Sequence, residues 1–198
     1  QQPRQVPDYY NIKTEDLVKG LQSPSLWEKR AAWHQISDRP VAETQKLARP
    51  LVQLASDAGQ EEITRIHALW SLEGIKHYDA ALLQALLQSP SDDLRREAVR
   101  SLSSFSPGTA TVAAYLKNVI EDKNPMVRAQ VLRTLDELGA ADEAVIDILV
   151  RASKPALEGN AMGGAYERNF ERFLARKALE QYPAQLAAYL NSPAAEKT

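Results

Sequence analysis

The sequence contains no cysteine among its 198 residues. Disulfides, thiolate metal sites, cysteine nucleophiles and covalent haem attachment through a C-x-x-C-H motif are therefore excluded within this chain. Histidine is also scarce, with three residues, and none of them has further ligands at the spacing of a metal site. We expect no cofactor and no metal.

Long apolar runs and an excess of one charge are absent as well. No stretch approaches the roughly 18 apolar residues of a membrane-spanning helix, and the N-terminal QQPRQVPDYY lacks the apolar segment of a signal peptide. We expect no membrane insertion, and either a cytoplasmic protein or a mature or excised piece of a longer one. The 24 basic and 26 acidic side chains give a net charge of −2, which does not favour general binding to nucleic acid.

The residues that are present follow a helical pattern. Apolar residues make up 44% of the chain and charged residues 25%, as in ordinary folded proteins. Apolar positions recur at helical spacing, and no window of four or more residues alternates like a half-buried strand. The sequence therefore predicts an all-α protein, with helices at residues 14–22, 26–38, 44–56, 63–75, 79–88, 92–103, 109–121, 126–138, 142–152, 166–182 and 184–191.

Short polar segments mark the ends of these helices. Thr14, Asp79, Thr109 and Asp142 are predicted N-caps, because their side-chain oxygens can accept hydrogen bonds from the free N–H groups of a first helical turn. Gly139 suits a left-handed C-terminal cap. These local signals support the helix boundaries.

The second helices of successive helix pairs align without gaps as RAAWHQI (30–36), IHALWSL (66–72), REAVRSL (96–102) and AQVLRTL (129–135). Helical pairs that repeat every 30 to 36 residues predict a right-handed α-α superhelix of about five to six pairs. We assign it to residues 14–191, with tails or linkers at 1–13 and 192–198. The predicted core columns are Ala32, Ala68, Ala98 and Val131; Trp33, Leu69, Val99 and Leu132; and Ile36, Leu72, Leu102 and Leu135.

A basic residue begins the second helix of each aligned pair, at Lys29, Arg65, Arg95 and Arg128. We predict a structural ladder in which these side chains bind acids or carbonyls of the adjacent repeat.

The units SPSDDLRREAVRSL and DKNPMVRAQVLRTLDELG resemble HEAT repeats, since an acidic or proline-containing turn precedes the basic residue. In addition, ITRIHALWSLEG (63–74) followed by MGGAYERNFERFLARKALE (162–180) is similar to the HEAT region of planctomycete and verrucomicrobial membrane-associated dehydrogenase-like proteins. This resemblance covers residues 10–191. It implies a place between a sugar-dehydrogenase-like β-propeller and a C-type cytochrome domain, and hence the periplasm or cell envelope. Neither domain lies in this chain, so the resemblance implies no redox chemistry here.

The side of each second helix that faces away from the core is a usual binding surface of solenoids. One aligned column on that side contains His34, Trp70, Arg100 and Arg133, and His67 lies one turn before Trp70. Trp70 stands where the other repeats have polar residues. It either anchors a partner or packs beneath a neighbouring segment. We interpret His67 as a satisfied or solvated side chain, and we keep all five as candidate partner-binding residues.

Residues 153–165 form a glycine-rich insertion that matches neither a P-loop nor a Rossmann fingerprint. The helix that follows has Arg168, Arg172 and Arg176 on one face, where like charges at this spacing repel one another. Either Glu171 and Glu180 pair with these arginines, or the arginines dock a carboxylate-rich or phosphate-bearing partner.

The sequence contains no recognisable nucleophile–base pair, carboxylate dyad or metal cluster. We therefore predict a non-catalytic HEAT-repeat scaffold, a monomer that docks another protein or flanking domains of the same polypeptide. The alternative is a HEAT-like nucleic-acid-binding or DNA glycosylase-type protein that uses Trp70, Arg100 and Arg133 on a concave surface. A lyase or chromophore-handling activity, as in some HEAT-like proteins, is a third possibility. Salt-dependent DNA binding separates the first two.

Overall fold

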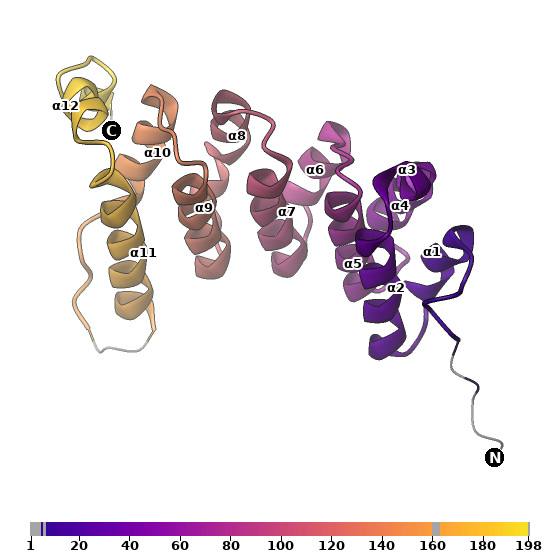
Figure 1. Cartoon of the computed structure of the whole chain (residues 1–198). Helices are drawn as coiled ribbons and strands as arrows, with labels where there is room; N and C mark the ends of the chain where they lie inside the picture. Colours follow the sequence, from indigo (N-terminus) through magenta and orange to yellow (C-terminus); the bar gives the residue numbers. More distant parts are fainter. Residues whose placement is uncertain (1–4, 6, 160–162, 198) are drawn as a thin grey trace. The chain divides into compact units, whose positions relative to one another are not determined.

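The structure is a computed structural model and describes residues 5, 7–159 and 163–197. These residues form helices and no strand, which confirms the all-α prediction (Figure 1). The chain divides into two compact units, Gln1–Leu94 and Arg95–Thr198, and the boundary falls inside one helix. None of the helices in the described ranges is long and apolar enough to cross a bilayer.

The first unit is built from helix pairs in two layers (Figure 1). Its second helices, α2 and α5, pack against each other, and α4 packs against both α5 and α6. The elements are η1 (Thr14–Asp16), α1 (Leu17–Gly20), α2 (Leu26–Asp38), α3 (Val41–Thr44), η2 (Gln45–Leu47), α4 (Ala48–Ser56), α5 (Glu62–Gly74) and α6 (Ala80–Leu87).

The second unit continues the alternation of first and second helices. Helix α9 packs on α11, while α10 contacts α8, α11 and α12. The elements are α7 (Asp92–Phe105), which begins in the first unit, α8 (Thr109–Leu116), η3 (Val119–Glu121), α9 (Pro125–Glu137), α10 (Glu143–Ala152), α11 (Gly164–Leu179), α12 (Pro183–Leu190) and η4 (Ala195–Lys197).

The predicted core columns are buried at every position except one. Ile36, Leu69, Val99 and Leu102 all have 0% exposure. Trp33 was assigned to the core and is instead half-buried. Because an indole is much larger than the leucine or valine of the other repeats, it extends to the edge of the core. There it meets the aromatic side chains of α5, as described below.

Three predicted helix caps are confirmed. The carboxylate of Asp79 accepts the Leu82 N–H at 2.8 Å, and that of Asp142 accepts the Val145 N–H at 3.0 Å. Gly139, which follows α9, has a φ of +64°, the left-handed conformation expected of a glycine cap.

Two predicted caps are wrong. Thr14 lies inside η1, and its hydroxyl accepts a hydrogen bond from Arg39 instead of capping a helix. Thr109 is the first residue of α8, because the preceding Gly108 takes the cap position with a φ of +100° that a threonine would adopt only with strain.

The basic ladder is present, and in the first unit it also caps helix C-termini. Lys29 Nζ donates to the carbonyl of Leu21 at the end of α1 and lies 2.8 Å from Glu61 Oε2, which precedes the next second helix. Arg65 Nε donates to the Ala55 carbonyl at the end of α4, at 2.9 Å. Cations are favourable at these helix ends, where carbonyls lack helical partners.

In the second unit, the ladder joins successive repeats through ion pairs. The Arg95 guanidinium binds both carboxylate oxygens of Asp122, at 2.6 and 2.9 Å. Arg128 donates to the backbone carbonyl of the same Asp122 and reaches Glu171 on α11 at 2.6 Å. The structural interpretation of these basic residues is therefore confirmed.

Candidate functional site

Four aromatic side chains of α2 and α5 form a cluster in the first unit. The ring centroids of Trp33 and Trp70 are 4.9 Å apart, and His67 lies 5.2 Å from Trp70 and 5.8 Å from Trp33. His34 stacks on Trp33 at 4.5 Å. Both tryptophans are partly exposed, so part of the cluster is accessible from outside. We call the exposed part of Trp33 and Trp70 the tryptophan surface.

A close approach of the two helices brings these rings together. Gly74 and Ser37 each lie four residues, about one helical turn, beyond Trp70 and Trp33. A Cβ atom placed on Gly74 would lie only 2.9 Å from the Ser37 backbone Cα, and closer still to its side chain. Because Gly74 has no side chain, α2 and α5 can approach closely here, and the tryptophans one turn earlier come into contact.

His67 lies beneath the tryptophan surface. Its side chain is 1% exposed. The sequence analysis kept His67 as a candidate partner-binding residue, but a side chain this deeply buried cannot contact a partner directly. Its Nδ1 is 2.8 Å from the Ile63 carbonyl and therefore carries the proton, while the buried Nε2 has no hydrogen-bond partner among the described residues. Burial lowers the pKa of His67, against the Ile63 hydrogen bond that raises it. His67 is a neutral support for the two indoles.

An arginine and a histidine of α2 lie at the rim of the tryptophan surface. Arg30 and His34 flank Trp33 in the sequence, and both are exposed. Neither has a hydrogen bond or an ion pair within the part of the chain that the structure describes. The structure thus brings together the predicted residues His34 and Trp70, and it adds Trp33 and Arg30, which the sequence analysis did not assign to this surface.

The other two residues of the predicted column lie in the second unit. Arg100 Nε is 2.8 Å from Glu97 Oε2, and the exposed Arg133 has its guanidinium carbon 5.6 Å from the centre of the Phe170 ring. Both guanidinium groups therefore already have partners within their own unit. Fewer of their N–H donors are therefore available to bind a phosphate.

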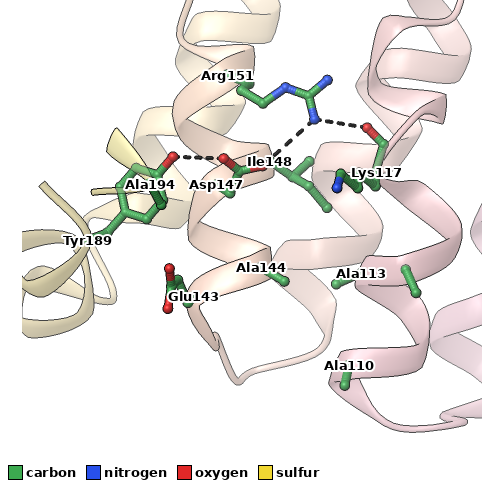
Figure 2. A pocket seen from close by; sticks show the side chains of 11 residues that line it. Ala110, Ala113, Lys117, Glu143, Ala144, Asp147, Ile148, Arg151, Tyr189 and Ala194 are labelled. Carbon is green, nitrogen blue, oxygen red and sulfur yellow. Dashed lines mark hydrogen bonds and ion pairs between the residues drawn. The ribbon is translucent and has the colours of Figure 1, made fainter. Parts of the chain in front are cut away.

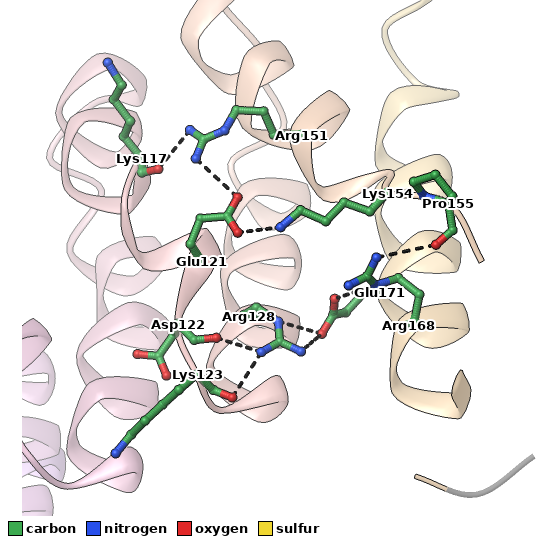
Figure 3. Close-up of polar contacts among 10 residues, drawn as sticks. All are labelled: Lys117, Glu121, Asp122, Lys123, Arg128, Arg151, Lys154, Pro155, Arg168 and Glu171. Atoms are coloured by element: carbon green, nitrogen blue, oxygen red, sulfur yellow. Dashed lines mark hydrogen bonds and ion pairs between the residues drawn. The ribbon is translucent and has the colours of Figure 1, made fainter. Parts of the chain in front are cut away.

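The arginines of α11 hold the segment that follows α10. Arg168 donates to the Pro155 carbonyl at 3.4 Å (Figure 3). Arg172 donates to the Lys154 carbonyl. Arg168 also pairs with Glu171 at 3.9 Å, as the sequence spacing predicts. Arg176 is exposed, with no ion pair among the described residues.

These contacts favour a structural role over docking for two of the three arginines. Arg172 binds a carbonyl just after α10, as Arg128 binds a carbonyl just after η3, so it continues the structural ladder. Gly163 has a φ of +79°, which favours the turn interpretation of the glycine-rich insertion. Residues 160–162 of that insertion lie outside the described part of the chain.

A cluster of charged side chains lies beside this segment (Figure 3). Glu121 binds both Lys154 and Arg151, and the Lys154 ammonium lowers the pKa of the Glu121 carboxyl. A cavity of about 170 Å³ lies among these groups and the Arg128–Glu171 pair. Three cations and three carboxylates line the cavity, so it has no excess charge that would favour an anion: Arg128, Lys154 and Arg168, and Glu121, Asp122 and Glu171.

A groove of about 700 Å³ in the second unit lies between α8, α10 and the C-terminal residues (Figure 2). Alanines such as Ala113 and Ala144 form much of its lining. Its polar groups bind one another: the Tyr189 hydroxyl donates to Asp147 at 2.7 Å, and Arg151 donates to the Lys117 carbonyl at 3.0 Å. The described residues contain no group of three side chains that could hold a metal ion.

Comparison with known proteins agrees with this architecture. Residues 79–157 match the family model of HEAT repeats. The matched residues run from the end of the first unit into the second, α6 to α10 and the segment after it. No curated protein matches the chain.

The solved structures that match this chain include two engineered proteins and a designed armadillo repeat protein. An engineered protein of the Northeast Structural Genomics Consortium is 17% identical with a TM-score of 0.47, covering 94% of this chain and 93% of that one. A second engineered protein of the same consortium is 17% identical with a TM-score of 0.49, covering 86% of this chain and 48% of that one. A designed armadillo repeat protein is 19% identical with a TM-score of 0.47, covering 94% and 91%.

Proposed function

We propose that this chain is a non-catalytic, monomeric HEAT-repeat docking domain and that the tryptophan surface of α2 and α5 binds a protein partner. The observation that carries the proposal is the pair of partly exposed tryptophans, packed at 4.9 Å on the second-helix side of the first unit. Tryptophan is among the residues that contribute most to protein–protein affinity, because it buries a large rigid surface.

The cluster is held in place before any partner arrives. His67 packs against both indoles, and the Ser37–Gly74 contact fixes the distance between the two helices. Association therefore does not require the tryptophans to be ordered first, and this lowers the entropic cost of binding. A rigid aromatic surface on packed helices suits docking.

The resemblance to membrane-associated dehydrogenase-like proteins supports a proposal about which domain binds the tryptophan surface. We propose that it is a flanking sugar-dehydrogenase-like propeller or an electron-transfer domain of the same polypeptide, in the periplasm or cell envelope. Trp70 lies within the segment 63–74, one of the two segments on which that resemblance depends.

A nucleic-acid-binding or glycosylase function has less support. It requires Arg100 and Arg133 to be available for phosphates, whereas Arg100 pairs with Glu97 and Arg133 lies over Phe170. The net charge of −2 adds no general attraction for a polyanion.

The docking proposal is tested by calorimetric titration of the chain with separately expressed flanking domains. Trp33→Ala and Trp70→Ala should each weaken association by about 30-fold, the effect of a central anchor worth about 2 kcal/mol. Trp27→Ala is the matched control, because Trp27 is 61% exposed and is not part of the cluster.

Circular dichroism on the same variants separates docking from folding. Retained helicity with lost association supports the proposal. Association that survives both substitutions contradicts it, as does unfolding of the first unit on Trp70→Ala, which would make the tryptophan a structural residue.

A further inference from the structure

Helix α12 takes the place of a first helix in the second unit, because it packs on α10 as α10 packs on α8. Among the described residues, only the three-residue η4 follows it, so this pair has no second helix there. In the row of second helices, α9 packs on α11, and α11 is the last member (Figure 1). The side of α11 that faces away from α9 is therefore the place where one more second helix would pack.

Five exposed residues at steps of three or four form a stripe along this side: Tyr166, Asn169, Phe173, Arg176 and Glu180. We call this stripe the open side of α11. Phe173 is 61% exposed and Tyr166 is 57% exposed. The equivalents of Phe173 and Arg176 in α9, 44 residues earlier, are Ala129 and Leu132, and these are only 3% and 1% exposed. The last second helix thus exposes aromatic surface at positions that are buried in the preceding repeat.

The basic ladder also lacks a partner at α11. In three earlier repeats the basic residue reaches an acid on the next second helix or in the turn before it: Lys29 to Glu61, Arg95 to Asp122 and Arg128 to Glu171. Arg172 is the next member of this ladder and donates to the Lys154 carbonyl, but within the described ranges it has no acidic partner. By the repeat pattern, that acid would belong to a helix beside α11.

A second repeated position, in the last turn of the second helices, shows the same gap. Ser103 of α7 donates to Glu137 of α9 at 2.7 Å, and Asp136 of α9 accepts from Lys177 of α11 at 2.6 Å. Glu180 holds this position in α11, where it is exposed and has no side-chain partner in the part of the chain described. Two positions that join each second helix to the next are therefore both unpaired at α11.

The charges of this region do not favour an acidic or a basic partner as a whole. A hollow of about 350 Å³ is lined by four residues of the open side and by Arg172 and Lys177. Lys177 is bound to Asp136, and Glu180 opposes Arg172 and Arg176. The order of the charges is informative instead, because both arginines precede Glu180 along α11. A helix whose acidic residue precedes its basic residue fits this order only when it runs parallel to α11.

From these features we infer that the open side of α11 binds one amphipathic α-helix of a partner protein, parallel to α11. The helix supplies a carboxylate to Arg172, apolar residues over Phe173 and Tyr166, and a lysine or amide donor to Glu180. It continues the α9–α11 interface, in which α11 itself presents an acid and then a base to α9. Burial of the aromatic rings contributes most of the affinity, and the charges set direction and selectivity. The inference is independent of the tryptophan surface, which lies in the first unit.

A labelled peptide with the sequence of residues 164–182 is a suitable probe, because it carries the residues that α11 presents to α9. Its binding to the full chain is measured by fluorescence anisotropy, and we expect saturable binding. The comparison peptide carries Glu171→Lys and Lys177→Glu, which reverse the order of its charges. It should bind about tenfold more weakly, since like charges then face each other at both ends.

Variants of the full chain test the location of binding. Phe173→Ala and Glu180→Lys should each weaken peptide binding by about tenfold while helicity is retained, because both residues are exposed. A peptide with Lys177→Glu and Gln181→Glu should restore binding to the Glu180→Lys chain. Met126→Ala and Glu143→Lys are the matched controls, as both residues are exposed in the same unit but outside the open side, and they should change binding less than about twofold.

The other outcomes overturn the inference. Lack of saturable binding at peptide concentrations up to about 1 mM removes the site, since an affinity below that level is worth less than about 4 kcal/mol. Binding that Phe173→Ala and Glu180→Lys leave unchanged shows that the peptide binds elsewhere or replaces α11 on α9. If sedimentation of the chain alone shows a dimer that Phe173→Ala abolishes, a second copy covers the open side in place of a partner helix.

Discussion

Replacing Gly74 by alanine should destabilise the first unit, although alanine is the better helix former. The added Cβ would lie 2.4 Å from Ser37 Oγ, 2.7 Å from its Cβ and 2.9 Å from its backbone Cα. The side-chain oxygen can rotate away, but the backbone Cα can move only if α2 and α5 separate. Overpacking of this kind costs about 1–3 kcal/mol, against a gain in helix propensity of up to about 1 kcal/mol.

The expected net loss is therefore about 1–2 kcal/mol, which lowers the melting temperature by roughly 2–8 °C in a chain of this size. Thermal unfolding followed by circular dichroism measures it, and tryptophan emission should shift because Trp33 and Trp70 lie one turn away. Gly164→Ala is the control: a Cβ there meets nothing within 4 Å, so its melting temperature should not fall. A Gly74→Ala variant as stable as the parent would refute the close-approach argument.

Four further results are expected. Because burial holds the pKa of His67 below its ordinary value of 6.5, the folded state binds this proton less readily than the unfolded state. The contribution of neutral His67 to the free energy of unfolding should therefore be fully present above pH 6.5 and decline as the pH falls below it. In urea titrations, His67→Leu should remove part of that decline. Leu102→Ala should cost about 2–5 kcal/mol at its fully buried position, whereas a chelator should not change the melt of the parent. Arg172→Ala should increase proteolysis of residues 153–159 without loss of helicity, whereas Arg176→Ala should not. Fluorescence anisotropy should show no appreciable binding of duplex DNA at physiological salt; salt-sensitive micromolar binding would contradict this.

The fold was predictable because the same pattern of buried apolar residues recurs in each repeat. Aliphatic residues such as Leu72, Leu102 and Leu135 occupy one column, and all three are at most 1% exposed. A basic residue at a fixed position before that column predicted the ladder, since an arginine there has few ways to satisfy its donors except at the neighbouring helix ends. Each repeat thus gave independent support for the same predicted packing of these apolar and basic positions.

The candidate site was less predictable, because it depends on the distance between two helices. Alignment placed Trp33 in the core by its column, and nothing in α2 alone shows that the ring turns toward Trp70. That contact requires the approach at Ser37 and Gly74, which lie in different helices and 37 positions apart. A single-helix pattern gives the face of a residue, but it does not give the distance to the next helix.

The arginines of α11 show how an error in register hides a structural role. By its apolar residues the last repeat aligns Ala178 with Val131, 47 positions earlier. The polar contacts of α9 with α11 and with Gln181 just after it instead join residues 41, 43 and 45 positions apart. An alignment about one turn earlier places Arg172 opposite Arg128 in the basic column. Both side chains donate to carbonyls just after the first helix of their own pair. In a solenoid with an insertion, a basic residue that binds carbonyls at the end of the preceding helix therefore fixes the alignment of a repeat better than a triplet of apolar residues does. Carbonyls at helix ends require a hydrogen-bond donor, whereas small apolar residues fit several positions.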